Sequence, residues 1–394
     1  MKSRPRLIIY SSHPIQYQVP WFRALHDTRE LDLLVVFSHL PNAQEQGSGF
    51  GVAFQWDVNL LDGYRWQAAQ TRTVIKAKSG FFQRVLAEPG FELAQHQADV
   101  ALLTGWQEFP LVQWLNRARR RGVPVIMRGE SNLLRHRRAV SRIWHRTILN
   151  RCDTFITVGA ANQAFYEHYG VSRDRLFSAP YFVDNEYFAL AASRAHPHRQ
   201  TARERCGIPA DATCFCFVGK LEQKKRVLVL LAALAIAQTV SSKRLHLLVV
   251  GSGEQIAKAR DVAEKNKLPV TFAGFMNQGE ISQAYDAADC LVLPSDAGET
   301  WGLVVNEAMA CARPAIVSDH VGCQPDLVDD GVTGYVFPLD DVDALAAALC
   351  KAAASDLVAM GQAAYNRVTS TCSVDRATAA TLDAVRATLG QTAR

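Results

Sequence analysis

Short apolar runs alternate with longer helix-like stretches along most of this chain, and the apolar runs predict buried strands. The predicted strands are residues 6–10, 31–37, 100–103, 123–127, 154–158, 214–219, 245–250, 270–275, 290–294 and 315–317, with a turn and strand at 331–337. The predicted helices are residues 19–26, 111–121, 227–238, 281–289, 341–354 and 375–389, with one more that begins near residue 300. Strands that alternate with helices are typical of parallel sheets. Because the alternation restarts after residue 210, we predict an α/β protein with two Rossmann-like parallel-sheet domains.

The length of 394 residues also favours two domains. We assign residues 1–188 to an N-terminal domain and residues 211–374 to a C-terminal domain. Residues 189–210 are rich in Ala, Arg and His and have little periodicity, so they predict an interdomain linker. Residues 375–394 form a last helix that we expect to pack back on the first domain.

The most informative stretch runs from the strand at 290–294, through a loop, into a helix. Open α/β sheets bind ligands at the C-terminal edge of their strands, where this loop lies. Thr300 is the expected N-cap, and Gly302 lets a ligand approach the backbone closely. The N–H groups of Trp301, Gly302 and Leu303 would then attract an anion such as phosphate.

Two carboxylates flank this helix start, with seven residues between Glu299 and Glu307. Glu307 is five residues beyond Gly302, or roughly 7–8 Å along a helix. This distance suits one carboxylate on a ribose while the helix tip holds a phosphate. The alternative is a pair of glutamates on a solvated helix end.

Two more strand ends of the second half complete this hypothesis. A basic loop with Lys220 and Lys225 follows the strand at 214–219, and the strand at 270–275 ends in Gly274-Phe275. Together the three edges suit a nucleoside diphosphate: lysines and N–H groups on the phosphates, Glu307 on the ribose, and backbone near residue 274 on the base. Each lysine taken alone could equally be a solvated side chain.

The sequence offers no P-loop, which argues against ATP hydrolysis. Its only Asp-x-Asp, Asp341-Val342-Asp343, fits a helix start better than a metal site. We therefore expect no metal and no cofactor, with Lys220 and Lys225 neutralising a departing diphosphate in place of a metal ion.

In the first half, two polar side chains follow predicted strands. His13 comes after the strand at 6–10, and Glu130 comes after the strand at 123–127. Both would lie at the ligand-binding edge of a parallel sheet and could touch substrate, although a loop histidine can also be simply solvated. The polar stretch at 41–51 predicts a long, mobile loop.

Composition points to a soluble protein, with 48% apolar and 21% charged residues. No signal peptide is visible, and the longest apolar run, 227–237, is far too short to span a membrane. The nine cysteines are odd in number and form no Cys-x-x-Cys pair, which favours reduced thiols and a cytoplasmic protein.

The net charge of +5 does not by itself imply nucleic acid, but residues 111–151 contain eleven arginines, no lysine and a single acid, Glu130. Trp114, Ile143 and Trp144 are interleaved with them. This region is either a solvated face or a patch that contacts anionic lipid head groups at the inner face of a membrane. Nucleic acid is the least favoured partner because no recognition motif accompanies the charge.

The second half resembles the donor-binding domain of GT-B glycosyltransferases, in particular the retaining family 4 group. The resemblance covers about residues 211–350 and rests on five motifs in order. They are Val218-Gly219-Lys220-Leu221 followed by Lys225, Val249-Val250-Gly251-Ser252-Gly253-Glu254, Phe272-Ala273-Gly274-Phe275, Glu299-Thr300-Trp301-Gly302-Leu303-Val304-Val305-Asn306-Glu307-Ala308-Met309-Ala310, and Asp329-Asp330-Gly331-Val332-Thr333-Gly334-Tyr335-Val336. Ser12-His13-Pro14-Ile15-Gln16-Tyr17 is similar to the opening of some bacterial members that build surface polysaccharides.

This resemblance implies two domains that face each other across a cleft, with a nucleotide-sugar donor bound to the second. Glu299 would contact the donor sugar and Glu307 the ribose. Lys220 and Lys225 would hold the diphosphate. The remaining predicted contacts are Gly219, Gly274, Phe275 and Trp301, and the amides of Gly302, Leu303 and Val304.

The chain departs from the family pattern at three places. Lys220 stands where arginine is usual, which keeps the charge but loses the bidentate fork. Arg226 stands where glycine is usual. The histidine that many members carry in the middle of the first domain has no match, and Arg128-Gly129-Glu130 occupies that neighbourhood.

The resulting hypothesis is a membrane-apposed glycosyltransferase that moves a sugar, with retention, from a UDP- or GDP-sugar to a glycan or polyprenyl-linked acceptor. The donor's own phosphate oxygen would take the acceptor proton. Two alternatives stay open. One is a nucleotide-sugar epimerase on the same fold, and the other is a non-catalytic subunit that keeps only the nucleotide site.

Overall fold

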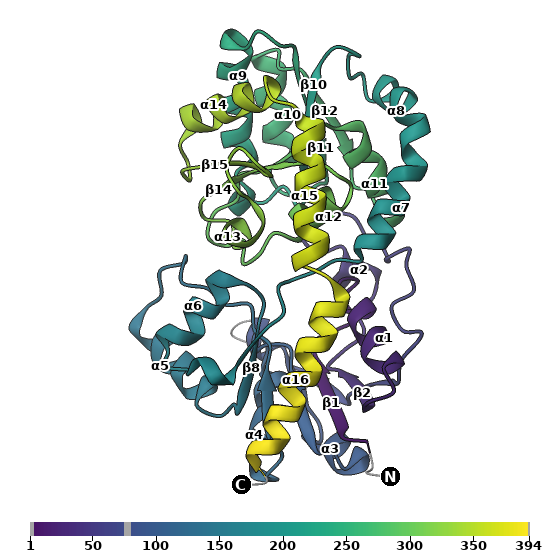
Figure 1. Ribbon diagram of the computed structural model, residues 1–394, viewed down its shortest axis with the longest axis vertical. Helices are drawn as coiled ribbons and strands as arrows, with labels where there is room; N and C mark the ends of the chain where they lie inside the picture. Colours follow the sequence, from purple (N-terminus) through teal and green to yellow (C-terminus); the bar gives the residue numbers. More distant parts are fainter. Residues whose placement is uncertain (1–3, 75–79, 393–394) are drawn as a thin grey trace. The chain divides into compact units, whose positions relative to one another are not determined.

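The computed structural model describes residues 4–74 and 80–392, and the chain divides into two compact units (Figure 1). The first unit takes in Met1–Pro41, Asn59–Tyr181 and Val374–Arg394, and the second takes in Asn42–Val58 and Phe182–Ser373. Each unit has its own parallel sheet, so the predicted α/β class with two Rossmann-like domains is confirmed.

The sheet of the first unit has seven parallel strands in the order β3-β2-β1-β6-β7-β8-β9. These strands are β1 (Arg6–Ser11), β2 (Asp32–Phe37), β3 (Trp66–Ala68), β6 (Val100–Leu103), β7 (Val125–Met127), β8 (Thr154–Thr157) and β9 (Leu176–Ser178). A strand covered on both faces must be apolar throughout, and the central β1 meets this demand with Leu7, Ile8 and Ile9 fully buried. A separate antiparallel pair joins β4 (Thr71–Thr73) to β5 (Arg84–Leu86).

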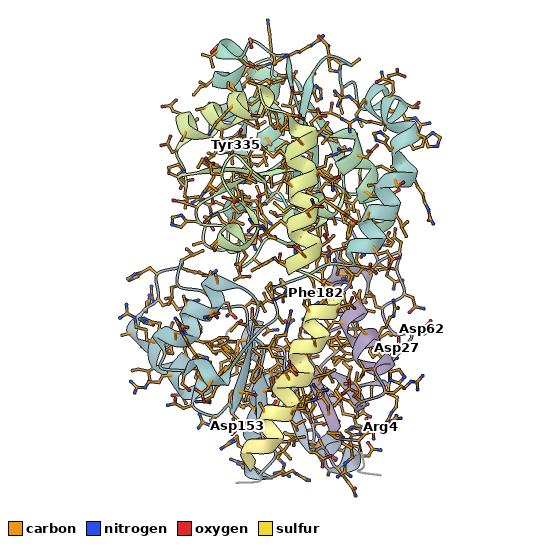
Figure 2. The ribbon with its side chains drawn as sticks, viewed as in Figure 1. Arg4, Asp27, Asp62, Asp153, Phe182 and Tyr335 are labelled. Atoms are coloured by element: carbon orange, nitrogen blue, oxygen red, sulfur yellow. The ribbon has the colours of Figure 1, made fainter. Side chains whose placement is uncertain are left out.

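The helices of the first unit are α1 (Val19–Asp27), α3 (Phe91–His96), α4 (Phe109–Arg120), α5 (Ala139–Leu149), α6 (Ala160–His168) and α16 (Val374–Thr392). The last helix, α16, packs against α1 and the sheet, where the Trp21 indole N–H donates to Thr381 Oγ1 at 3.1 Å. Asp153, labelled in Figure 2, accepts from the Val125 N–H at 2.7 Å and from Arg119 at 3.0 Å, which fixes α4 beside β7.

The sheet of the second unit has six parallel strands in the order β12-β11-β10-β13-β14-β15. They are β10 (Thr213–Val218), β11 (Leu245–Val250), β12 (Val270–Gly274), β13 (Cys290–Leu293), β14 (Ala315–Ser318) and β15 (Gly334–Phe337). This is the doubly wound order: successive strands are added toward one edge from β10 to β12 and toward the other edge from β13 to β15, so the strand order reverses between β10 and β13. Ligands of such sheets bind beyond the carboxyl ends of the strands at that reversal, so the loops after β10 and β13 are where a site is expected.

The helices of the second unit are α2 (Ala43–Gln46), α7 (Asn185–Ala195), α8 (Arg199–Arg205), α9 (Val227–Val240), α10 (Ile256–Lys265), α11 (Gln278–Ala287), α12 (Leu303–Ala310), α13 (Gln324–Leu327), α14 (Val342–Ala353) and α15 (Leu357–Thr371). The apolar α9 packs beside α14, and both helices share one core cluster with strands of the sheet. Within the described residues, no single helix is long and apolar enough to cross a membrane, and one bent pair of helices meets the test on length and composition only.

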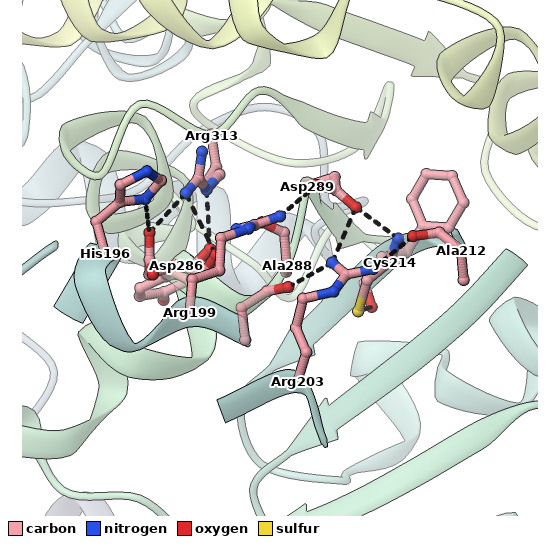
Figure 3. A network of polar contacts seen from close by, with 12 residues as sticks. His196, Arg199, Arg203, Ala212, Cys214, Asp286, Ala288, Asp289 and Arg313 are labelled. Atoms are coloured by element: carbon pink, nitrogen blue, oxygen red, sulfur yellow. Dashed lines mark hydrogen bonds and ion pairs between the residues drawn. The ribbon is translucent and has the colours of Figure 1, made fainter. Parts of the chain in front are cut away.

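Residues 189–210, for which the sequence predicts a linker, are mostly helical in α7, α8 and the 3-10 turn His196–His198, and they belong to the second unit. A polar network anchors them (Figure 3). Arg199 pairs with Asp289 at 2.5 Å, and the buried Arg203 donates to Ala212 O at 2.6 Å. Asp289 also accepts from the Cys214 N–H at 2.8 Å, which ties α8 to the central strand β10.

Candidate donor-binding site

The centre of the candidate site is an ion pair between Lys225, in the loop after β10, and Glu299, in the loop after β13. Their side chains are only 11% and 15% exposed. Burial on its own would raise the pKa of Glu299, but the Lys225 ammonium outweighs this effect and holds that pKa below its usual value. Two residues predicted to act on one ligand therefore meet at the strand-order reversal of the sheet.

Lys220 lies in the same loop and makes a different contact. Its Nζ donates to the Ser48 carbonyl at 2.6 Å and lies 4.9 Å from the centre of the Phe50 ring. Partial burial lowers the pKa of Lys220. Lys220 and Lys225, the two lysines predicted to bind the diphosphate, thus belong to one loop. Lys220 is held by Ser48 and Phe50, from the first half of the chain.

Glycines allow the loops after β10 and β11 to pack tightly together. A Cβ on Gly251 would lie 1.9 Å from the Gly219 carbonyl oxygen, and one on Gly253 would lie 2.8 Å from the Leu221 nitrogen. The Leu221 N–H donates to Ser252 O at 2.9 Å. The Gly-x-Gly of the sequence, Gly251 and Gly253, therefore packs directly against the lysine loop, residues 219–226.

The helix after β13 begins later than the sequence predicts. Its N-cap is Gly302, with φ +105°, so the expectation of an N-cap at Thr300 is wrong. A left-handed backbone favours glycine, and a Cβ here would also lie 2.9 Å from Leu293 Cδ2. The N–H groups of Leu303 and Val304 have no intrahelical acceptor in such a helix and are suited to an anion, whereas the Val305 N–H donates to Gly302 O at 2.9 Å.

Trp301 is buried, at 3% exposure, and its indole N–H donates to Asn306 Oδ1 at 2.8 Å. Its ring is therefore part of the core beneath the loop. Leu303 and Val304 at the start of α12 are half-buried, so their backbone is closer to solvent than that of Trp301.

Glu307 lies on α12 and is 5% exposed. Its carboxylate accepts the Tyr285 hydroxyl at 2.5 Å. Tyr285 was not predicted as a site residue, although the hydroxyl of a tyrosine that becomes buried usually has a polar partner. The pair fixes the Glu307 side chain in one orientation.

Gly274 and Phe275 end β12. Gly274 has φ +80°, and its carbonyl accepts the Gly251 N–H at 2.7 Å. The Phe275 ring lies 4.3 Å from that of Phe54. The second unit therefore brings the loops of Lys225 and Glu299 into contact, and α12, which carries Glu307, follows the Glu299 loop directly.

The two candidates from the first half both lie in the first unit. His13 follows β1, with Nδ1 3.0 Å from Ser12 Oγ and its ring 5.4 Å from that of His39. Glu130 follows β7 and accepts the Tyr181 hydroxyl. Since β6 lies between β1 and β7 in the sheet, these two side chains do not form one cluster.

Arg128, two residues before Glu130, was not predicted to be a site residue. Arg128 is 1% exposed, and its guanidinium lies 5.1 Å from the Trp21 ring and 4.5 Å from the Tyr181 ring. The cation stacks between aromatic faces, which fixes the end of β7 where Glu130 stands. Within the described residues, no group of three or more His, Cys, Asp or Glu side chains has the geometry to hold a metal ion.

Known proteins resemble this chain both in sequence and in fold. Residues 198–367 match the sequence model of the family described as "Glycosyl transferases group 1". The chain is 36% identical over 165 residues to a D-inositol 3-phosphate glycosyltransferase of Saccharomonospora viridis. The aligned region covers 39% of this chain and 38% of that protein. It is 28% identical over 182 residues to a lipopolysaccharide 1,2-N-acetylglucosaminetransferase of Salmonella typhimurium, covering 44% of this chain and 45% of the relative. The chain therefore spans less than half the length of these two relatives.

Solved structures match over nearly the whole chain. A glycosyltransferase from Rickettsia africae has a TM-score of 0.70 at 13% identity, with 98% of this chain and 99% of that chain covered. HepE from Anabaena, solved with UDP and glucose, has a TM-score of 0.71 at 15% identity, with 97% and 100% covered. At such identities the similarity shows the fold alone. The chain thus has the GT-B fold, and its residues 198–367 match the group 1 glycosyltransferase model.

Proposed function

We propose that this protein is a retaining glycosyltransferase that moves a sugar from a UDP- or GDP-sugar to a glycan or polyprenyl-linked acceptor in polysaccharide biosynthesis. The observation that carries the proposal is the Lys225–Glu299 ion pair at the strand-order reversal of the second sheet. The names of the relatives, which include an inositol-phosphate and a lipopolysaccharide glycosyltransferase, support sugar transfer. The UDP and glucose in the HepE structure favour UDP as the nucleotide.

In this proposal, the cations and the start of α12 hold the diphosphate. Lys225 and the amides of Leu303 and Val304 contact phosphate oxygens, because ammonium groups and a helix N-terminus both stabilise anions. Lys225 already pairs with Glu299. Its charge therefore also orients the carboxylate that we assign to the donor sugar.

Glu307 accepts from the ribose hydroxyls. The Tyr285 hydroxyl donates to Glu307 at 2.5 Å and orients it, and a carboxylate accepts more than one hydrogen bond. The backbone at Gly274 and Phe275 receives the base.

The transfer itself needs no separate general base. The acceptor oxygen bonds to the anomeric carbon on the face from which the diphosphate departs, and the bond between that carbon and the phosphate oxygen breaks. The acceptor proton goes to the phosphate oxygen that carried the sugar. Lys225 and the α12 dipole stabilise the charge on the departing diphosphate.

Turnover of Glu299→Gln tests this assignment, because the substitution keeps the shape of the side chain and removes its charge. We expect kcat to fall by about 10²–10³, measured as UDP or GDP release across a panel of sugar donors and acceptors. Lys258→Ala, on the exposed face of α10, is the matched control and should keep full turnover. Unchanged turnover of Glu299→Gln would contradict the role, and an isomerised sugar formed from donor alone would favour the epimerase.

We also propose a cytoplasmic location with contact to the inner face of a membrane through α5. Val140 and Ile143 are 77% and 69% exposed, and Trp144 is 38% exposed. The three lie on one stripe of the helix, and Arg142 and Arg146 are exposed beside it. An exposed apolar stripe with cations beside it fits anionic lipid head groups. All nine cysteines are free thiols, which suits a reducing compartment.

Vesicle flotation tests the membrane contact. The protein should float with vesicles that contain phosphatidylglycerol and stay behind with pure phosphatidylcholine. The double variant Ile143→Ser, Trp144→Ser should lose most of this binding, whereas Val240→Ser, at a site 69% exposed on α9, should keep it. Equal flotation of the double variant would leave α5 as a solvated face.

A further inference from the structure

Segment 42–58, which the sequence predicts in part as a mobile loop, is a folded piece of the second unit. It opens with α2, whose N-cap Asn42 and Glu45 form a reciprocal capping box. The segment then turns back on itself, because the Phe54 N–H donates to Ala43 O at 3.1 Å. At the turn, a Cβ on Gly47 would lie 1.9 Å from the Val52 carbonyl oxygen. The segment therefore has its own internal hydrogen bonds and close packing.

One end of this segment contacts the lysine loop after β10. The Ser48 carbonyl accepts from Lys220 Nζ at 2.6 Å, and the Phe50 ring lies under the same ammonium at 4.9 Å. The contact is close, since a Cβ on Gly49 would lie 2.8 Å from the Glu222 carboxylate. A hollow of about 850 Å³ lies beside this contact, with Gly49, the lysine loop and Asp296 among its walls.

The other end contacts the strand edge after β12. The rings of Phe54 and Phe50 lie 4.3 and 5.1 Å from the Phe275 ring. Asn277 Nδ2 donates to Gln55 O at 2.8 Å, and Asp57 accepts the Gly279 N–H at the start of α11 at 3.0 Å. The ring packing and two hydrogen bonds of residues 54–57 do not involve Lys220 or Lys225, whereas the Phe50 ring contacts both Phe275 and the Lys220 ammonium.

We propose that segment 42–58 is a donor-responsive part of the nucleotide site, with Phe54 as a positioning residue for the backbone of Gly274 and Phe275. This inference rests on the proposed function and adds residues that the motifs of the second half do not include. The Ser48 carbonyl holds the Lys220 ammonium until a diphosphate oxygen replaces it. Residues 54–57 stay anchored on Phe275 and α11 throughout.

The exchange follows from the strengths of the two hydrogen bonds. In the bond from Lys220 to Ser48 only the donor is charged. In a bond from the same ammonium to a diphosphate oxygen both partners are charged, so Coulomb attraction adds to the hydrogen bond. Binding of the diphosphate therefore removes the Lys220 contacts of Ser48 and Phe50 and loosens residues 48–52. It leaves residues 54–57 in place because nothing in their contacts changes.

Hydrogen–deuterium exchange tests the contact without any nucleotide. In Lys220→Met, which keeps the length of the side chain and removes its ammonium, we expect faster exchange at residues 48–52 and unchanged exchange at 54–57. UDP added to the wild type should produce the same pattern, and UDP added to Lys220→Met should add nothing to it. Unchanged exchange at 48–52 in Lys220→Met would overturn the inference, whatever the nucleotide result.

Titration calorimetry with UDP tests the positioning role. Phe54→Ala should weaken UDP binding about tenfold, Phe54→Leu should restore most of it, and Val52→Ala, at a site 41% exposed on the same segment, should bind like the wild type. Equal UDP affinity in Phe54→Ala would overturn this role. A wild type that binds neither UDP nor GDP would contradict the proposed function, while the exchange experiment would still decide whether Lys220 holds the segment.

Discussion

At the residue scale, left-handed backbone positions shape both loops of the candidate site. Gly302 takes φ +105° directly before α12, and Arg226 takes φ +53° directly before α9. Arginine in this conformation costs about 1–2 kcal/mol. Ion pairs with Asp296 at 3.4 Å and Asp340 at 2.9 Å offset part of that cost. They also give a physical reason why this chain tolerates arginine at a position where glycine is usual.

Gly302→Ala should destabilise the second unit by about 2–4 kcal/mol, because the new Cβ adds left-handed strain to a close contact with Leu293 and Val321. Urea unfolding of the variant measures this loss. The matched control is Gly331→Ala, which has φ +77° and nothing within 4 Å of the new Cβ. The control should lose only about 1–2 kcal/mol. Equal losses of unfolding free energy in the two variants would contradict a contribution from close packing at Gly302.

At the element scale, β11 and β12 carry a buried imidazole. His246 on β11 is 4% exposed, and its Nε2 lies 3.0 Å from Thr271 Oγ1 on β12. Burial lowers the pKa of His246 to about 4. Below pH 6.5, the ordinary pKa of histidine, the unfolded chain binds a proton at this residue, whereas the folded chain keeps His246 neutral down to about pH 4. The stability that neutral His246 contributes is therefore fully present above about pH 6.5 and is lost as the pH falls toward 4.

His246→Gln should flatten the acid limb of the stability profile of the second unit between pH 6.5 and pH 4. Glutamine can still donate to Thr271 and does not titrate in this range. The difference from the wild type should reach up to about 3 kcal/mol at the acid end, measured by urea unfolding at several pH values. The exposed His198→Gln serves as control and should keep the wild-type slope. An unchanged slope in His246→Gln would contradict the assignment.

The same scale shows which elements a sequence pattern can predict. Buried strands such as β1 and β10 were predicted because each contains an unbroken apolar run, residues 7–10 and 214–218. The short strands β3, β4, β5 and β9 were missed because their residues are only partly buried and carry polar side chains. The helices α7 and α8 were read as a linker because a buried charge, Arg203, holds α8, and such packing leaves no apolar period.

At the scale of the whole molecule, the fold class follows from alternation of strands and helices, and it was predicted without coordinates. The site was predicted only where its residues lie in local motifs after strand ends, as with Lys225 and Glu299. Tyr285 and segment 42–58 were not predicted as parts of the site, because their contacts join distant parts of the chain. Local sequence spacing carries no information about such contacts. The hydrogen bond from Lys220 to Ser48, for example, spans 172 residues.

The account depends most on the claim that the second unit holds a nucleoside diphosphate through Lys225 and the start of α12. Titration calorimetry of UDP and GDP into the wild type and Lys225→Met measures this directly. We predict that one of the two nucleotides binds the wild type and that the variant binds it at least tenfold more weakly, which corresponds to about 1.4 kcal/mol. Equal affinity in Lys225→Met, or no binding of either nucleotide to the wild type, would contradict the claim.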